Sequence, residues 1–277
     1  MIRKIVVPVR GDGKGDQVLR HVAALADRTE AMIEVIHCRA RPEDMLPYGV
    51  PVPDFLRKQI VEQSYKVADL EEANLRDELA TLARDLDIPE RRITFVEEVG
   101  RQVDVIKRHG RLADVIAVPK PDRDRNLGAN TLKAALFHSG RPVLMCPAID
   151  VKPPALGARV TLAWNGSAEA ARALASSMAL LRQAGEVIVL STGMDAGPGT
   201  DTTSLLTYLD QHGIQARLHE IAGSGTVGPL LLSETKDLGA DMLIMGAYGD
   251  SHERETVFGG NTQSVVDTSN LPVLLAH

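Results

Sequence analysis

The strongest constraint on the fold is an internal repeat, because two copies of one pattern of strands and helices run through the chain of 277 residues. In the first half an apolar, β-rich run at 2–9 leads through a Gly/Asp turn into a helical pattern. In the second half the run at 159–164 does the same through Asn-Gly-Ser. The next apolar runs begin at Met32 and Val187, which are 155 positions apart. The sequence therefore predicts two copies of one structural unit.

Each unit runs strand, helix, strand, helix, strand, helix, strand, helix, strand, and its strands are nearly continuous in Val, Ile and Leu. Such strands, separated by helices, are typical of a parallel sheet that helices cover on both faces. We therefore expect an α/β protein with two tandem doubly wound domains, each a five-stranded parallel sheet flanked by helices. The expected domains are residues 1–148 and 158–277, joined by a segment that contains several prolines.

Composition and charge narrow the classes of function. With 44% hydrophobic and 25% charged residues, the chain has enough apolar material for two cores. The net charge of -6 argues against nucleic-acid binding, since general affinity for phosphate backbones depends on clustered Lys and Arg. No apolar run approaches the roughly 20 residues of a membrane helix. Cys38 and Cys146 form no CxxC pair and no secretory segment follows Met1, so we expect a cytoplasmic protein without a membrane partner.

Residues 246–262 carry the strongest chemical signal. They follow a predicted strand, hold glycines at 246, 249, 259 and 260, and lead into the last predicted helix. Glycines let a backbone approach a phosphate closely, and the amides at a helix N-terminus favour an anion. Thr262 adds a hydroxyl donor. The pattern predicts a phosphate site built without lysine, while the same glycines also fit a plain strand exit and a tight turn into a helix.

This segment, together with 163–167 at the first strand of the second half, resembles the universal stress protein family. The resemblance covers nearly the whole chain and identifies it as a tandem, two-domain member with a fold like that of the adenine nucleotide alpha hydrolases. ATP-binding members carry a G-x2-G-x9-G-(S/T) signature, whose glycines and hydroxyls contact phosphates and ribose. The resemblance implies a stress-response regulator that binds ATP, or the related AMP or ADP, with Mg²⁺, in its C-terminal domain.

Carried onto this sequence, the signature predicts a set of nucleotide-binding residues. They are Ala163, Asn165, Gly246, Gly249, Gly259, Gly260, Asn261 and Thr262. Two of them depart from the family pattern: Gly260 stands where the signature has Ser or Thr, and Asn165 replaces an aspartate that contacts adenosine, keeping an acceptor but not the charge. The charged residues between Gly249 and Gly259 are expected to point outward, because carboxylates beside a triphosphate repel it unless they hold Mg²⁺.

The first domain contains a shortened copy of the glycine segment. Pro119 and Asp122 align with Gly246 and Gly249, and the copy reaches Gly128 after nine positions where the second domain needs thirteen. Proline removes an amide donor, and Asp122 adds a negative charge where phosphate would lie. We therefore expect the first domain to be a packing partner that does not bind ATP.

Other motifs give weaker signals. Residues 223–228 fit the dinucleotide fingerprint G-x-G-x-x-G but follow the third strand of their domain, which favours a loop beside the site over an NAD site. No P-loop, GxSxG or HExxH sequence occurs, and His37–Cys38 is more typical of a buried edge pair than of a metal or redox centre. We expect binding without catalytic residues or a metal site, and at most slow ATP hydrolysis.

The strands at 141–147 and 271–277 close the two units, and exposed apolar edges of this kind pair with their like. In single-domain relatives such strands pair between subunits, so the resemblance implies an internal pseudo-dimer that leaves the chain free to form a homodimer. A long amphipathic helix at about 56–86 is open to two interpretations, a surface for an unidentified protein partner or a solvated helix. The alternative to nucleotide binding is a nucleotide-independent stress-response scaffold that uses this helix.

Overall fold

A computed structural model describes residues 1–9, 14–39, 41, 53–125, 127–193, 200–222, 226–249 and 260–277. Its strands are β1 (Lys4–Val9), β2 (Met32–Arg39), β3 (Ile93–Val99), β4 (Val115–Pro119), β5 (Val143–Cys146), β6 (Arg159–Ala163), β7 (Glu186–Ser191), β8 (Ala216–Glu220), β9 (Met242–Gly246) and β10 (Val273–Ala276). Its helices are α1 (Gly15–Thr29), α2 (Asp54–Asp85), the short 3-10 helix η2 (Glu90–Arg92), α3 (Gln102–Gly110), α4 (Ala129–His138), α5 (Ala168–Leu181), α6 (Thr202–Gln211), α7 (Val227–Asp237) and α8 (Gly260–Thr268).

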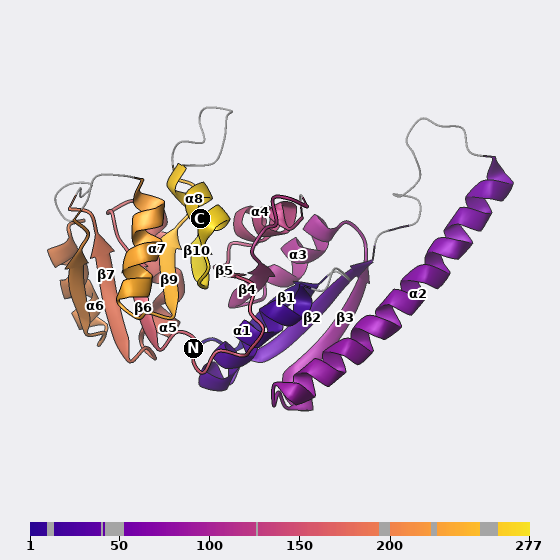
Figure 1. Cartoon of the computed structure of the whole chain (residues 1–277), viewed down its shortest axis with the longest axis horizontal. Coiled ribbons are helices and arrows are strands. Elements are labelled where there is room, and N and C mark those ends of the chain that lie inside the picture. Colours follow the sequence, from indigo (N-terminus) through magenta and orange to yellow (C-terminus); the bar gives the residue numbers. More distant parts are fainter. Residues whose placement is uncertain are drawn as a thin grey trace.

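The strands form one ten-stranded sheet in the order β3-β2-β1-β4-β5-β10-β9-β6-β7-β8, with helices on both faces (Figure 1). The order within the two halves is the same, since β8-β7-β6-β9-β10 corresponds to β3-β2-β1-β4-β5. Neighbours within each half run parallel, whereas β5 and β10 pair antiparallel, with Leu144 opposite Leu274. The predicted fold class, two doubly wound five-stranded parallel units, is confirmed.

The core explains why the strands read as unbroken apolar runs. Ile5 and Val7 of β1 point into one apolar layer, and Val6 between them points into the layer on the opposite face of the sheet. Both layers also contain residues of β5 and β10, so each continues across the junction between the halves. Because helices cover both faces, neither side of a central strand needs polar residues.

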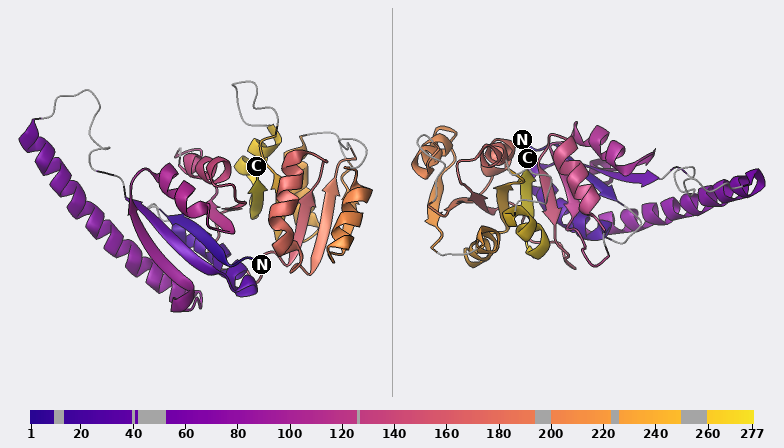
Figure 2. Two further views of the ribbon diagram at one scale, coloured as in Figure 1. Left: turned by 180° about the vertical axis from the view of Figure 1, so that it is seen from behind. Right: turned by 90° about the horizontal axis from the view of Figure 1, so that it is seen from above.

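Helix α2 is the element that departs most from this compact arrangement. It lies beside the outermost strand β3, and its N-terminal part extends past the sheet (Figures 1 and 2). Its buried residues are Leu75, Leu79 and Ala83, all in its C-terminal half. The helix predicted at about 56–86 agrees with α2 (Asp54–Asp85) to within two residues at its start and one residue at its end. None of the helices in the described part of the chain combines the length and apolar composition needed to cross a membrane.

His21 of α1 links the first half to the segment that follows β5. Its ring is buried, and Nε2 donates a hydrogen bond to the carbonyl oxygen of Pro147 at 3.1 Å. Nδ1 is buried without a hydrogen-bond partner. Burial lowers the pKa of His21 below its ordinary value, since a second ring proton would be an unsatisfied buried donor.

The β5–β10 junction generates the first prediction. Leu144→Ala and Leu274→Ala should each lower the free energy of unfolding by about 2–5 kcal/mol, because both side chains are buried. The two changes should be non-additive by about 0.5 kcal/mol or more, because the residues face each other across the junction. Urea denaturation of the single and double variants measures this. Strict additivity would contradict the pairing, and the exposed Leu112→Ala is the control.

The second prediction concerns pH. Because the pKa of His21 is lower in the folded chain than in the unfolded chain, the unfolded chain binds the extra proton more readily. Stability from this group is complete above about pH 6.5 and declines as the pH falls below it. His21→Gln should therefore reduce the loss of stability between pH 7 and pH 5, by at most about 1.4 kcal/mol per pH unit. Urea midpoints measured across this range test it, with the same replacement at the exposed His138 as control. Equal slopes for wild type and His21→Gln would contradict it.

Candidate functional site

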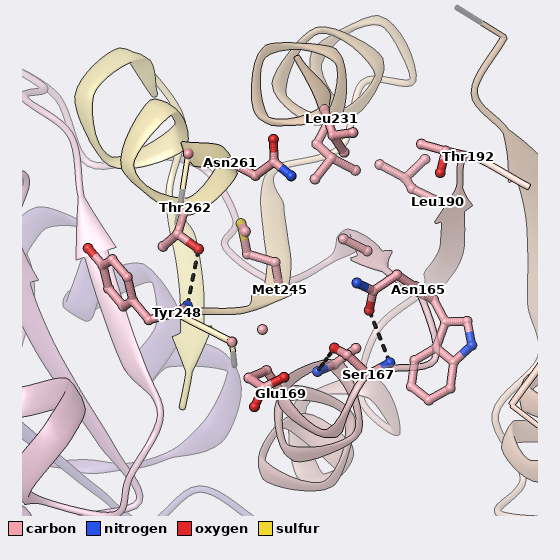
Figure 3. A pocket seen from close by; sticks show the side chains of 17 residues that line it. Asn165, Ser167, Glu169, Leu190, Thr192, Leu231, Met245, Tyr248, Asn261 and Thr262 are labelled. Carbon is pink, nitrogen blue, oxygen red and sulfur yellow. Dashed lines mark hydrogen bonds between the residues drawn. The ribbon is translucent and has the colours of Figure 1, made fainter. Parts of the chain in front are cut away.

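A cavity of about 370 Å³ lies at the carboxyl ends of β6 and β9 (Figure 3). These strands are neighbours in the sheet, and the chain turns outward from β6 toward β7 and β8 before it returns to β9. Such a reversal of strand order is where open α/β sheets bind ligands. The cavity is lined by Ala163, Trp164, Asn165, Ser167, Glu169, Ala170, Leu190, Thr192, Val227, Leu231, Met245, Gly246, Tyr248, Gly249, Gly260, Asn261 and Thr262.

The structure brings seven of the eight predicted nucleotide-binding residues together in the lining of this cavity. They are Ala163, Asn165, Gly246, Gly249, Gly260, Asn261 and Thr262. Gly259 lies outside the described residues, as do the charged residues at 250–255 that were expected to point outward. Of the predicted loop at 223–228, residues 223–225 lie outside the described residues, and Val227, the first residue of α7, lines the cavity.

The three glycines that line the cavity, Gly246, Gly249 and Gly260, have different surroundings. A Cβ atom on Gly246 would lie 2.5 Å from the carbonyl carbon of Glu169 and 2.6 Å from the nitrogen of Ala170, so β9 can pass the start of α5 only because this residue has no side chain. A Cβ atom on Gly249 would lie 3.1 Å from Oε2 of Glu169. At Gly260 nothing lies within 4 Å. Gly246 is thus required for packing, whereas Gly260 leaves open space at the N-terminus of α8.

Asn165 faces the cavity, but with a different group from the one expected. Its Oδ1 accepts a hydrogen bond from the backbone N–H of Ser167 at 3.1 Å, and Ser167 in turn caps α5 by accepting from the N–H of Ala170. The acceptor that the sequence analysis assigned to a ligand is therefore engaged in the turn. The amide NH₂ group points toward the cavity and offers donors (Figure 3).

Thr262 holds the exit of β9 against α8. Its Oγ1 accepts a hydrogen bond from the backbone N–H of Tyr248 at 3.2 Å, and its hydroxyl proton remains available to donate. Tyr248 has a φ of 53°, an uncommon conformation for a residue with a side chain. Burial raises the pKa of Tyr248 to about 12, so its hydroxyl stays protonated at neutral pH. Its ring packs 5.3 Å from that of Phe137, on α4 of the first half.

Glu169 is the main lining residue that the sequence analysis missed. Its side chain is largely buried, and Oε1 accepts from Nη1 of Arg172 at 3.2 Å. Among the described residues that line the cavity, Glu169 alone carries a formal charge. From sequence alone it is an acid in the first turn of a helix, a common and purely structural position, so only the tertiary contact with Gly249 identifies it.

An apolar wall was also missed, because it joins elements far apart in the sequence. Leu190 of β7, Leu231 of α7 and Met245 of β9 all line the cavity. Trp164 closes the side near β7, where its Nε1 donates to the carbonyl oxygen of Thr200 at 2.8 Å. No sequence motif brings these residues together.

The equivalent place in the first half holds only about 20 Å³ of space, bounded in part by Lys14, Pro119 and Gly128. The sequence analysis expected Asp122 to add a negative charge at this place, but in the structure its charge is paired. Its carboxylate forms an ion pair with Nζ of Lys14 at 2.9 Å, and the hydrogen bond from Lys14 lowers the pKa of Asp122. Backbone hydrogen bonds between Asp122 and Leu127 close the shortened segment.

The described residues contain no cluster of three or more His, Cys, Asp or Glu that could hold a metal ion. His37 is buried on β2, and burial lowers its pKa. Its neighbour Cys38 is a free cysteine whose Sγ donates to the carbonyl oxygen of Gly100. The predicted buried edge pair is thus met only in part, because Cys38 is half-buried and β2 lies between β1 and β3 rather than at an edge of the sheet.

Comparison with known proteins gives a family for the second half of the chain and a fold for the whole of it. Residues 158–277 match the universal stress protein family. A universal stress protein from Archaeoglobus fulgidus DSM 4304 has the same fold, with a TM-score of 0.70 and 19% identity over 99% of this chain and 95% of that one. A putative universal stress protein from Pseudomonas aeruginosa UCBPP-PA14 aligns with a TM-score of 0.56 and 18% identity over 99% of this chain and 93% of that one. No curated protein matches the sequence. Residues 158–277 therefore form a universal stress protein domain, and the chain shares the fold of both structures over nearly its whole length.

Proposed function

We propose that this chain is a stress-response regulator that binds an adenine nucleotide, ATP or the related AMP or ADP, in the cavity of its C-terminal half. The observation that carries the proposal is the cavity at the β6–β9 reversal, which seven of the eight predicted nucleotide-binding residues line together. Its volume of about 370 Å³ falls in the range of small-molecule sites.

The lining of the cavity offers both kinds of surface that a nucleotide needs. The apolar wall formed by Leu190, Leu231 and Met245 offers a surface for a flat base. The lining also offers glycine backbone at Gly249 and Gly260 and the N-terminus of α8, where amides and the helix dipole favour phosphate oxygens.

The charge of the lining bears on the form in which ATP binds. Among the described lining residues there is no Lys, Arg or His, and Glu169 adds a carboxylate beside Gly249. A bare triphosphate is therefore repelled there. Mg²⁺ suits the donor set, because it binds carboxylate and phosphate oxygens together, so ATP is proposed to enter with Mg²⁺.

The nucleotide can regulate only by favouring one conformation over another. Tyr248 gives a physical route, because its backbone N–H is bonded to Thr262 in the lining while its ring packs on Phe137 of the first half. A ligand that moves the Gly249 turn acts directly on the contact between the two halves. An unidentified protein partner would then recognise the resulting arrangement.

The alternative, a nucleotide-independent scaffold, is favoured by one observation, the exposed apolar residues on α2. Mass spectrometry of small molecules released from the purified chain separates the two proposals. Co-purified adenine nucleotide supports the first, and a clean preparation that also fails to bind added nucleotide supports the second.

The third prediction is that the wild-type chain binds one ATP per chain and that Gly249→Leu weakens binding at least about 100-fold. A leucine side chain at this position must collide with Glu169 or fill the cavity. Isothermal titration calorimetry gives both the affinity and the stoichiometry. Gly185→Ala, which places a methyl group outside the cavity in the same half, is the control. Retained affinity in Gly249→Leu, or two sites per wild-type chain, would contradict the proposed site.

The fourth prediction isolates the charge of the cavity. Glu169→Gln should increase the affinity for ATP about tenfold in the presence of EDTA, because it removes a carboxylate beside Gly249. In excess Mg²⁺ the gain should be smaller or reversed, since the cation loses a ligand. Calorimetry with and without Mg²⁺ measures both effects. Glu90→Gln changes the net charge equally at an exposed residue of the first half and should have no effect. A similar response of the two variants would contradict a local role of Glu169.

A further inference from the structure

The N-terminal part of α2 has an apolar seam that no described element of the chain covers. The exposed fractions are 39% for Leu56, 41% for Ile60, 54% for Val67 and 63% for Leu70. Together with Gln63 these residues are spaced by four, three, four and three positions, the spacing of a coiled-coil seam.

This seam is separate from the face that α2 packs on the sheet. At about 100° per residue, the buried residues Leu75, Leu79 and Ala83 lie about 150° around the helix from the line through Val67 and Leu70, which is nearly the opposite face. The chain thus uses one face of α2 for its own core, while a second apolar face reaches solvent on the part that extends past the sheet (Figure 2). An exposed row of large apolar side chains is typical of an interaction surface.

Charges along the seam indicate what covers it. Arg57 and Lys58 lie near its N-terminal end, and Glu71 lies at its C-terminal end. In an antiparallel pair that sets Ile60 against Leu70, Arg57 of one helix comes opposite Glu71 of the other. A parallel pair would instead bring Lys66 of one helix to Glu71 of the other and leave Arg57 without a carboxylate opposite it. Neither Arg57 nor Glu71 forms an ion pair within the described chain, so both are available.

Lys66 is the residue that an antiparallel pair places near its own copy. Its repulsion is offset within each helix, because Nζ of Lys66 is 3.0 Å from Oε1 of Glu62. The seam is therefore complementary to a second copy of itself both in its charges and in the spacing of its apolar residues.

We propose that two copies of this chain dimerise through antiparallel packing of their α2 helices along Leu56, Ile60, Val67 and Leu70, with Arg57 and Glu71 paired at both ends of the contact. The surface is independent of the antiparallel β5–β10 contact, which already joins the two halves within one chain. The seam is short, so the dimer is weak and forms with rising concentration.

Sedimentation velocity of the full chain from about 1 µM to about 500 µM tests the proposal. The wild type should shift from the chain mass of 29.9 kDa toward twice that mass. Val67→Glu/Leu70→Glu should stay monomeric and keep its helical circular dichroism, since both side chains are exposed in the single chain. The control is Leu112→Glu/Val151→Glu, the same chemical change at exposed residues outside α2, and it should dimerise like the wild type. A monomeric wild type, which would leave the seam to another protein, or a dimer that survives Val67→Glu/Leu70→Glu would overturn the proposal.

The ion pairs and the direction of packing are tested separately. Arg57→Glu and Glu71→Arg should each weaken dimerisation about tenfold, and the double variant should restore it. Under mild oxidation Lys66→Cys should form a disulfide between chains, because it lies near the twofold axis of the antiparallel pair, whereas Arg57→Cys should not. In a parallel pair both residues would lie level with their own copies, so equally efficient linkage through Arg57→Cys and Lys66→Cys would show parallel packing and overturn the proposal.

Discussion

The antiparallel pairing of β5 with β10 is the contact on which the rest of the structure depends. Each half of the chain ends in a short apolar strand, and an unpaired edge of this kind would expose both main-chain hydrogen-bonding groups and buried side chains. Pairing the two edges satisfies both at once and makes each apolar layer continuous. Because β9 lies next to β10, the same contact also fixes one wall of the cavity.

The two halves show how one architecture can keep or lose a cavity through a few residues. In the second half Gly246 lets β9 pass close to α5, and about 370 Å³ stays open beyond it. In the first half Pro119 ends the corresponding strand, and the ion pair of Lys14 with Asp122 lies beside the remaining 20 Å³. The backbone topology is the same, so the difference arises from side chains and from the length of one segment.

The sequence allowed prediction of the fold because its information is local and repeated. Continuous Val/Ile/Leu runs identify strands buried on both faces, and the 155-residue offset requires two similar units. The glycines of the site were predictable for a related reason, since their spacing is fixed between a strand and a helix. Glu169 was not predictable, because an acid in the first turn of a helix has an ordinary structural explanation. The sequence also did not predict that Oδ1 of Asn165 accepts a hydrogen bond from Ser167 in its own turn. That bond depends on the local backbone conformation and not on residue type alone.

The proposed nucleotide site and the α2 seam lie in different halves, on opposite sides of the β5–β10 junction. Nucleotide binding and dimerisation are coupled only if both favour or oppose the same conformational change. In that case nucleotide binding would change the affinity of dimerisation by the same factor as dimerisation changes the affinity for nucleotide. The contact of Tyr248 with Phe137 carries such a change only as far as α4. From α4 a packed route to α2 runs through α3, whose His109 bonds Glu34 of β2 and Glu98 of β3, so it still passes through hydrogen-bonded strands of the sheet. A rigid sheet of this kind transmits displacement poorly unless it has two arrangements, so nucleotide binding and dimerisation are best treated as independent properties of one chain.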